Sequence, residues 1–268
     1  MFRPAVRAIL SSFVTISTIS SIATPLVAQQ PTDSAAPVSP PPAVVDSTVF
    51  RPHPLHAWEV GAVAALGSLT IAVVDQPAKE WAQDPAHRSE TAADVADVVR
   101  TFGQWSGVLV VTGGLVGTGL VAHEPKILHA GLRVGASALV AGVVTQGAKW
   151  AFGRTRPEST DDEWDFQPFS GNESMWSGHS AFAFAMATSL SQDIHRTWAT
   201  VGLYTLATAT AWSRVYDNEH WVSDVAVGAA AGFIGAKLAT GRWTLFGLRA
   251  PMPLATGKQV GLVWSGTF

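Results

Sequence analysis

Three polar clusters decide the fold: KWAFGRTRP at residues 149–157, WSGHS at 176–180 and SRVYDNEHWVSD at 213–224. Each contains cationic, hydroxyl or imidazole side chains, which are the groups that bind or react with a phosphate. An apolar segment separates the second cluster from the third, and the chain around them is rich in Ala, Val and Gly. The pattern predicts one site assembled from the ends of helices.

Composition limits the class of protein. The chain has 268 residues, of which 47% are hydrophobic and 14% charged, and no linker divides it after residue 50. One large domain is therefore expected, and the low charge favours a membrane-embedded one. The net charge of -3 and the lack of a basic stripe argue against nucleic acid as a partner. Because the chain has no cysteine, disulfides, thiolate metal sites and cysteine nucleophiles are excluded.

The first fifty residues have the composition of a targeting segment followed by a linker. Arginines precede an apolar run at residues 8–27, which predicts a signal peptide over residues 1–28 or, alternatively, an uncleaved anchor helix. Residues 29–50 are rich in Pro, Ala and Ser and are expected to form an extended linker. This leaves a helical domain at residues 51–241 and a tail at 242–268.

Six apolar segments in the domain are long enough for helices and do not alternate as strands do. They cover residues 58–74, 102–122, 127–152, 179–191, 197–213 and 221–240. The second contains no charged residue and is the strongest candidate for a membrane span. A short amphipathic helix is expected within residues 75–100, and loose alternation at 243–250 and 259–268 predicts a terminal β-hairpin. The expected fold class is therefore all-α.

Three cations in the clusters supply what a phosphate site needs. A phosphate monoester is close to doubly charged at neutral pH, so its site requires cations and directed N–H donors. Lys149, Arg156 and Arg214 provide the positive charge. Because Pro157 cannot continue the preceding helix, Lys149 and Arg156 are expected where that helix gives way to a loop. Each cation alone would suit a solvated helix end, so the hypothesis depends on their occurring together.

The second cluster has the residues of a helix start. Ser177 and Gly178 precede an apolar run, which is a capping signal, and free N–H groups at a helix start bind anions. Gly178 would let a phosphate approach the backbone. His179 could protonate a leaving oxygen, although a lone histidine here would more often cap the helix or be buried.

His220 and Asp224 lie four residues apart at the start of the last apolar segment. On a helix this spacing places both on one face, so Asp224 can accept from one ring nitrogen of His220 and leave the other free to attack. A zinc site is the alternative, since two histidines and scattered carboxylates could supply ligands. The neighbouring cations would repel a metal ion, and no metal or other cofactor is expected.

In this order and spacing, the three clusters resemble the signature of the type 2 phosphatidic acid phosphatase superfamily, which includes bacterial class A acid phosphatases and vanadium haloperoxidases. The resemblance covers residues 100–240 and implies an all-helical fold with six core helices, and metal-independent hydrolysis of phosphate esters through a phosphohistidine. It also implies the residue roles: phosphate binding by Lys149, Arg156, Ser177, Gly178 and Arg214, general acid catalysis by His179, nucleophilic attack by His220, and orientation of His220 by Asp224. The chain departs from the family in having Trp176 where proline is usual, which removes no reacting group but could place an aromatic ring at the mouth of the site.

The loop between the first two clusters combines acidic and aromatic residues. Its carboxylates are Glu158, Asp161, Asp162, Glu163, Asp165 and Glu173. They either screen out highly anionic substrates or are simply solvated. Its aromatic residues Trp164, Phe166, Phe169 and Trp176 either receive a lipid chain near a bilayer interface or pack the loop against the helix ends.

The leading hypothesis is a metal-independent phosphomonoesterase or pyrophosphatase acting on lipid phosphates. The alternatives are a periplasmic acid phosphatase with soluble substrates, a vanadate-dependent haloperoxidase and a membrane scaffold with an inactive site. The expected partners are a phosphorylated lipid or other phosphate ester, and membrane lipid. The sequence indicates no oligomeric state.

The expected location is the bacterial cell envelope, in the inner membrane with the site facing the periplasm, or alternatively a soluble periplasmic protein. A cleaved signal peptide followed by six crossings would instead turn the first cluster toward the cytoplasm. The expectations agree if the N-terminal segment stays cytoplasmic without inserting, or if one apolar segment does not cross.

Overall fold

The computed structural model describes residues 52–248 and the backbone of residues 252–256 and 259–263. The predicted signal peptide or anchor and the predicted linker lie outside these residues. The described helical elements are α1 (Ala57–Thr70), the π-helix η1 (Ile71–Asp75), α2 (Gln76–Gln83), η2 (Pro85–His87), α3 (Glu90–Arg100), η3 (Thr101–Gly103), α4 (Trp105–Val121), α5 (Pro125–Phe152), α6 (Gly178–Ile194), α7 (Thr197–Tyr216) and α8 (Val222–Ala239). The described strands are β1 (His53–Pro54), β2 (Trp243–Thr244), β3 (Met252–Thr256) and β4 (Gln259–Val263).

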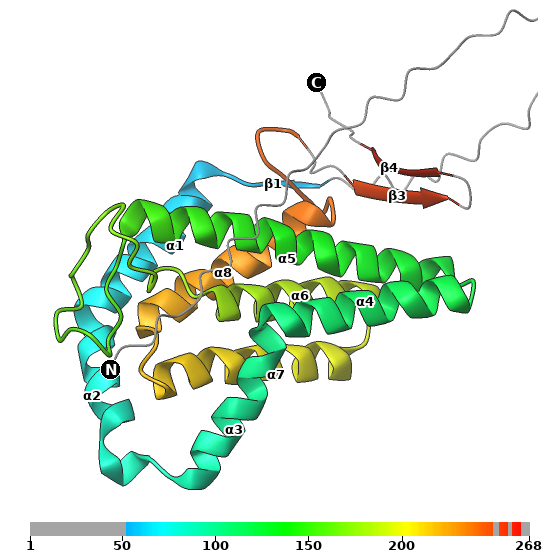
Figure 1. The fold of residues 1–268 in the computed structure, drawn as a ribbon. Coiled ribbons are helices and arrows are strands. Elements are labelled where there is room, and N and C mark those ends of the chain that lie inside the picture. Colours follow the sequence, from blue (N-terminus) through cyan, green and yellow to red (C-terminus); the bar gives the residue numbers. More distant parts are fainter. Residues whose placement is uncertain (1–51, 249–251, 257–258, 264–268) are drawn as a thin grey trace, which may run out of the picture. The chain divides into compact units, whose positions relative to one another are not determined.

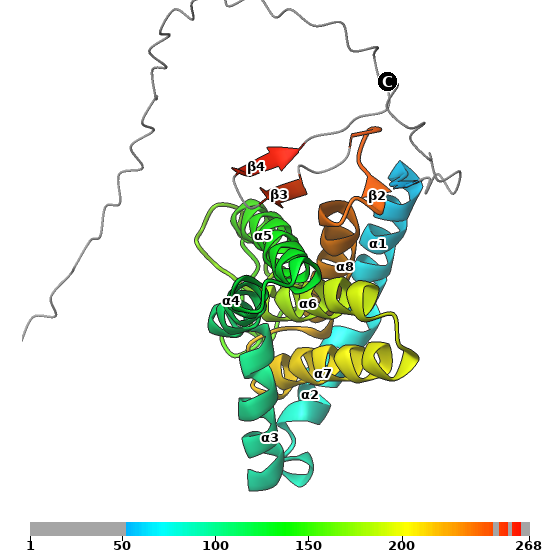
Figure 2. The ribbon, with the colours of Figure 1, turned by 90° about the vertical axis from the view of Figure 1, so that its right-hand side faces the viewer.

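Helix α6 lies in the middle of the bundle. It packs against α5, α7 and α8, and Figure 2 shows it between these helices. Helix α4 runs antiparallel to α5, and the two form a helical hairpin (Figure 1). The core is built from small and medium side chains, among which Val134, Ala138 and Met186 are fully buried. The expectation of an all-α bundle is confirmed, with each predicted apolar segment corresponding to a helix.

Glycines set the close approach of α8 to α6. A Cβ at Gly228 would lie 2.6 Å from the carbonyl oxygen of Ser177, and one at Gly232 would collide with the carbonyl of Ala181. Only glycine therefore lets these two backbones pack so closely. The contact brings the start of α8 beside the start of α6, where the second and third polar clusters meet.

The expected span at residues 102–122 needs correction. Helix α4 begins only at Trp105, because Gly103 and Gln104 end the preceding turn, and the segment before the break is bent by 55° from α4. Composition remains apolar across the break, so hydropathy does not register it. The segment counts as a membrane span only if the two bent parts are taken together.

Three described helical stretches are long and apolar enough to cross a membrane: Ala57–Gln83, Pro125–Phe152 and Val222–Ala239. The bent pair Glu90–Gly103 and Trp105–Val121 would make a fourth. The outer faces of these helices carry exposed apolar side chains, such as Val121, which is 82% exposed, and Val143, which is 65% exposed. Apolar surface of this extent is typical of helices that face lipid.

The terminal hairpin is confirmed, but its first strand was predicted in the wrong place. β3 pairs antiparallel with β4, whereas β2 pairs in parallel with β1. Leu245 and Leu248 exchange backbone hydrogen bonds across a tight turn with positive φ at Phe246 and Gly247. That turn ends the alternation at residues 243–250. Pro253 lies within β3, where an edge strand tolerates it.

Candidate functional site

The three polar clusters converge on one cavity of about 410 Å³. Its lining includes the predicted site residues Lys149, Arg156, Gly178, His179, Arg214 and His220, and also Gly103, Gln104, Trp105, Phe182 and Glu219. Ser177 and Asp224 do not line the cavity; both are buried behind it. The prediction of a single constellation thus agrees with the geometry, while the chemical roles of the residues stay predictions.

The first turn of α6 lines the cavity through Gly178 and His179. Ser177 is the N-cap, and its Oγ accepts from the backbone N–H of Ser180 at 3.4 Å. The same residue donates its own N–H to the carbonyl oxygen of Asp224 at 3.1 Å. Ser177 therefore positions the helix start, and the free N–H groups near Gly178 remain available to an anion.

The C-terminal end of α5 positions two cations. Lys149 lies in its last turn, and the helix ends at Gly153, whose left-handed conformation reverses the chain. A Cβ at Gly153 would collide with the carbonyl oxygen of Gln167, so glycine is required there. Arg156 follows in the loop. The predicted transition from helix to loop between Lys149 and Arg156 is confirmed.

Glu219 is a component of the cavity that sequence reasoning missed. Its carboxylate pairs with Arg156 and lies 3.3 Å from Nη2 of Arg214. Arg214 is nearly buried, with 4% of its side chain exposed, and its Nε has no hydrogen-bond partner among the described residues. The carboxylate therefore occupies the position that an anionic ligand would take between the two arginines.

His220 and Asp224 lie close together, as predicted from their spacing. Nδ1 of His220 is 3.8 Å from Oδ2 of Asp224, which is an ion-pair distance but too long for a hydrogen bond. Asp224 already accepts from the backbone N–H of Trp221 at 3.1 Å and from Ser174 Oγ at 2.5 Å. Because Nδ1 faces Asp224, Nε2 is the nitrogen of His220 that is left for the cavity.

A buried ion network behind the cavity was also missed. Arg154 is fully buried, and its guanidinium bonds both Asp75 and Asp224 at 2.8 Å. It also donates to Ser223 Oγ at 2.7 Å. Asp75 is the last residue of the π-helix η1, a wide turn of the kind found near functional sites. Arg154 thus holds α8 and η1 to the loop that carries Arg156.

In the absence of a bound anion, burial and nearby cations disfavour the protonated form of both cavity histidines. Burial, followed by the charges of Arg214, His220 and Lys149, lowers the pKa of His179 to about 3. Burial also lowers the pKa of His220, against the opposing effect of Asp224. A phosphate dianion among these cations would act in the opposite direction and favour protonation of His179.

Trp176 does not lie at the mouth of the polar cavity. It lines a separate apolar cavity of about 430 Å³ together with Phe152, Trp164, Phe166 and residues of α1 and α8. Phe169 is excluded from this cavity and packs against Trp150, with ring centroids 4.6 Å apart. The aromatic side chains of the loop therefore divide between an apolar cavity and surface packing.

Two acidic residues of the loop approach the polar cavity. Glu173 lies 3.5 Å from Nζ of Lys149, and Glu158 lies 3.9 Å from Arg156. Asp161, whose side chain is 92% exposed, instead pairs with Lys79 at 2.6 Å. The loop thus places negative charge beside two of the predicted phosphate-binding cations.

A sequence profile of the PAP2 superfamily matches residues 130–245, which contain all three clusters. Residues 130–245 are therefore similar to the PAP2 superfamily. Over 108 residues, 40% of the chain, it is 41% identical to lipid A 1-phosphatase of Porphyromonas gingivalis. Over 129 residues, 48% of the chain, it is 29% identical to the putative undecaprenyl-diphosphatase YbjG of Escherichia coli.

The fold also has a match among solved structures. The crystal structure of Aquifex aeolicus LpxE superimposes with a TM-score of 0.51 at 19% identity, covering 63% of this chain and 95% of that one. At this identity the likeness shows the fold. The two curated relatives are matched over 21% and 63% of their own lengths.

Proposed function

We propose that the protein is a phosphatase that hydrolyses lipid phosphates at the polar cavity without a metal ion. The observation that carries the proposal is the convergence of two imidazoles and three cations on one cavity at the N-terminal end of α6. Cations and helix N–H groups suit the charge of a phosphate and of its transition state. The imidazoles supply a nucleophile and a proton donor.

In the first half-reaction, Nε2 of His220 attacks phosphorus while the bond from phosphorus to the leaving alkoxide oxygen breaks. His179 donates its proton to that oxygen, and a phosphohistidine results. In the second half-reaction, His179 takes a proton from a water molecule, whose oxygen attacks phosphorus as the phosphorus–nitrogen bond breaks. Inorganic phosphate leaves, and both imidazoles return to their starting states.

The surrounding residues assist both half-reactions. Asp224 favours the tautomer of His220 with the proton on Nδ1 and stabilises positive charge on the ring. A shortening of the 3.8 Å separation by less than one ångström would give this pair a hydrogen bond. The charge of the substrate itself raises the pKa of His179, so the acid becomes protonated only when a phosphate is bound.

Several features support a lipid as the carrier of the phosphate. The relatives of the domain are named for lipid A and undecaprenyl diphosphate. The candidate spans expose apolar side chains, and the apolar cavity beside Trp176 has the size and lining to accept part of a hydrocarbon chain. We further propose that the protein resides in the inner membrane of a bacterial envelope with the cavity facing the periplasm.

The test is turnover by protein purified in detergent, assayed against lipid and soluble phosphate esters with a strong chelator present. We expect activity on lipid phosphates, inhibition by vanadate, and no activity for His220→Ala or His179→Ala. Labelled phosphate trapped on the wild-type protein during turnover should be absent from His220→Ala. His129→Ala, a substitution in α5 outside the cavity, serves as the control for folding and expression.

Three results would contradict parts of the proposal. Labelled phosphoprotein in His220→Ala would exclude that residue as the nucleophile. Loss of activity on chelation, restored by a divalent metal, would indicate a metallophosphatase. A preference for soluble esters over every lipid phosphate would assign the domain to soluble substrates.

A further inference from the structure

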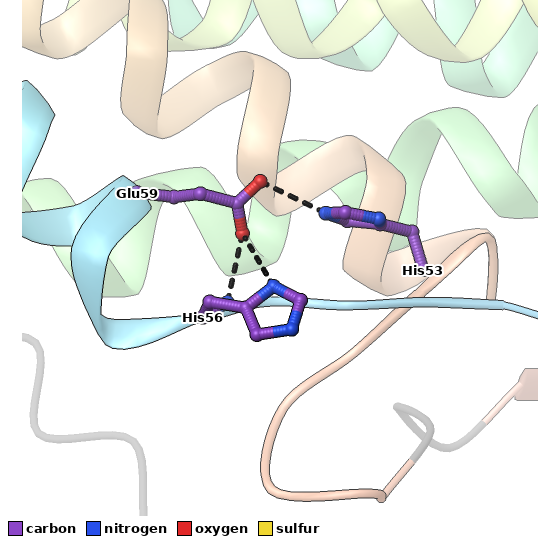
Figure 3. Close-up of side chains that lie close together, drawn as sticks. All are labelled: His53, His56 and Glu59. Carbon is purple, nitrogen blue, oxygen red and sulfur yellow. Dashed lines mark hydrogen bonds and ion pairs between the residues drawn. The ribbon is translucent and has the colours of Figure 1, made fainter.

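His53, His56 and Glu59 bring three potential metal ligands together where the chain enters α1 (Figure 3). We propose that these side chains bind a divalent transition-metal ion, with zinc as the preferred ion. The three ligand atoms, one from each residue, lie within 4.8 Å of one another. This site is separate from the polar cavity and does not depend on the proposed phosphatase activity.

The distances between the donor atoms suit a metal ion. Nε2 of His53 lies 2.8 Å from Oε1 of Glu59, and Nδ1 of His56 lies 3.5 Å from Oε2. Bonds of about 2.0–2.1 Å around a tetrahedral ion place neighbouring donors about 3.3 Å apart. The two separations lie on either side of this value but reach different carboxylate oxygens, so Glu59 must either bind the ion through both oxygens or rotate to present one oxygen beside both nitrogens.

The backbone around these residues is already fixed. His53 lies in β1, donates its N–H to the carbonyl oxygen of Arg242 at 3.0 Å, and packs its ring on Trp243 with centroids 4.9 Å apart. His56 is the N-cap of α1, and its N–H donates to Oε2 of Glu59 at 2.8 Å. Such a hydrogen bond orients a ligating carboxylate in the way that outer-shell partners of metal sites do.

The chemistry of the ligands selects the class of ion. Two imidazoles and one carboxylate are borderline ligands, which bind zinc and its neighbours more strongly than magnesium or calcium. The rings are 45% and 49% exposed, so water can complete the coordination shell. Without a metal, the Glu59 carboxylate is held by hydrogen bonds to the His53 ring and to the backbone N–H of His56.

A bound ion would join β1 to the first turn of α1. His53 is attached through β1 to β2, so the ion would also tie the strand pair to the helix. Glu59 lies 16 positions before Asp75, and that many residues of helix span about 24 Å. Asp75 is the residue that contacts the buried Arg154. We therefore expect the metal to change stability at this end of the bundle and to leave phosphate binding unchanged.

The experiment uses the full chain in detergent, purified with a tag that contains no histidine and stripped with chelator. Titration with zinc, followed by calorimetry and elemental analysis, should show one ion per chain. His53→Ala and His56→Ala should each weaken binding at least tenfold. Glu59→Gln should do the same, although its amide oxygen retains the helix-capping hydrogen bond.

A control and a second readout make the result decisive. His129→Ala removes a histidine elsewhere and should bind zinc as the wild type does. Zinc should raise the thermal unfolding midpoint of the wild type and of His129→Ala but not of His53→Ala. Absence of stoichiometric zinc, or equal binding by wild type and by the variants at residues 53, 56 and 59, would overturn the proposal.

Discussion

Replacing Glu219 by glutamine should strengthen the binding of phosphate. In the phosphate-free protein the Glu219 carboxylate pairs with both Arg156 and Arg214, so an incoming phosphate must displace it. Glutamine keeps the size of the side chain and one oxygen acceptor but removes the competing charge. The positive potential of the two arginines then becomes available to the ligand.

The size of the effect follows from the contacts that are lost. A hydrogen bond to a charged group contributes about 1.5–3 kcal/mol. Glu219 is 31% exposed, so solvent screens part of this interaction and about 1–2 kcal/mol is a reasonable expectation. At about 1.4 kcal/mol per factor of ten, phosphate or vanadate should bind roughly 5- to 30-fold more tightly.

The assay compares inhibition constants for inorganic phosphate and vanadate, and KM for a phosphate ester, in detergent. Glu158→Gln is the matched control, because Glu158 lies 3.9 Å from Arg156, is 49% exposed, and does not contact Arg214. Its inhibition constants should change less than about twofold. Equal or weaker phosphate binding by Glu219→Gln would refute the view that this carboxylate competes with the ligand.

Three further outcomes are expected. Arg154→Met should lower the free energy of unfolding by about 3–5 kcal/mol, because it leaves two buried carboxylates without their cation. Asp161→Asn, at a paired carboxylate that is 92% exposed, should have little effect in the same denaturant titration. The free energy of unfolding of the phosphate-free protein should decrease as pH falls from about 6.5 toward about 3, because His179 binds a proton in the unfolded state but not in the folded state. The decrease should reach about 2 kcal/mol at a pH of about 5. His179→Gln should flatten this pH dependence, and an unchanged profile in the variant would contradict the low pKa of His179. Trp164→Ala should reduce the preference for long over short acyl chains, measured as the ratio of kcat/KM values, while Phe169→Ala, outside the apolar cavity, should leave that ratio unchanged.

Local chemistry explains why much of the cavity could be predicted from the sequence. Lys149 and Arg156 flank the end of α5, and Gly153, the residue that ends this helix, lies within the same nine-residue cluster. The capping role of Ser177 and the four-residue spacing of His220 and Asp224 are equally local. Such features can be predicted from the sequence because the residues that start and end a helix lie close together along the chain.

Contacts that depend on tertiary structure could not be predicted in the same way. Arg154 is two positions from Arg156 and has the same side chain, yet one is fully buried against carboxylates and the other faces the cavity. Asp75, 79 positions from Arg154, is brought to it only by the packing of η1 against α8. The sequence likewise does not distinguish Glu219 from the other acidic residues, because only the folded structure places it between Arg156 and Arg214.

The arrangement of α1 leads to a prediction about membrane topology. Helix α1 begins near Leu55 and Val60, which line one cavity with Leu238 at the end of α8. The same stretch reaches Asp75, which contacts Arg154 and accepts from the backbone N–H of Ser223 at the start of α8. One passage of this stretch through a bilayer therefore separates its first residues from the phosphate cavity.

Two single-cysteine variants of this cysteine-free chain test that separation in intact cells. Ser159→Cys lies on the exposed loop beside the cavity, and Ala57→Cys lies at the exposed start of α1. If the cavity faces the periplasm, a membrane-impermeant reagent should label Ser159→Cys in cells whose inner membrane is intact, and Ala57→Cys only after that membrane is opened. This outcome requires the N-terminal region to remain cytoplasmic, so it also argues against a cleaved signal peptide. Labelling of both cysteines from the same side would mean that α1 does not cross, and labelling in the reverse order would place the cavity in the cytoplasm.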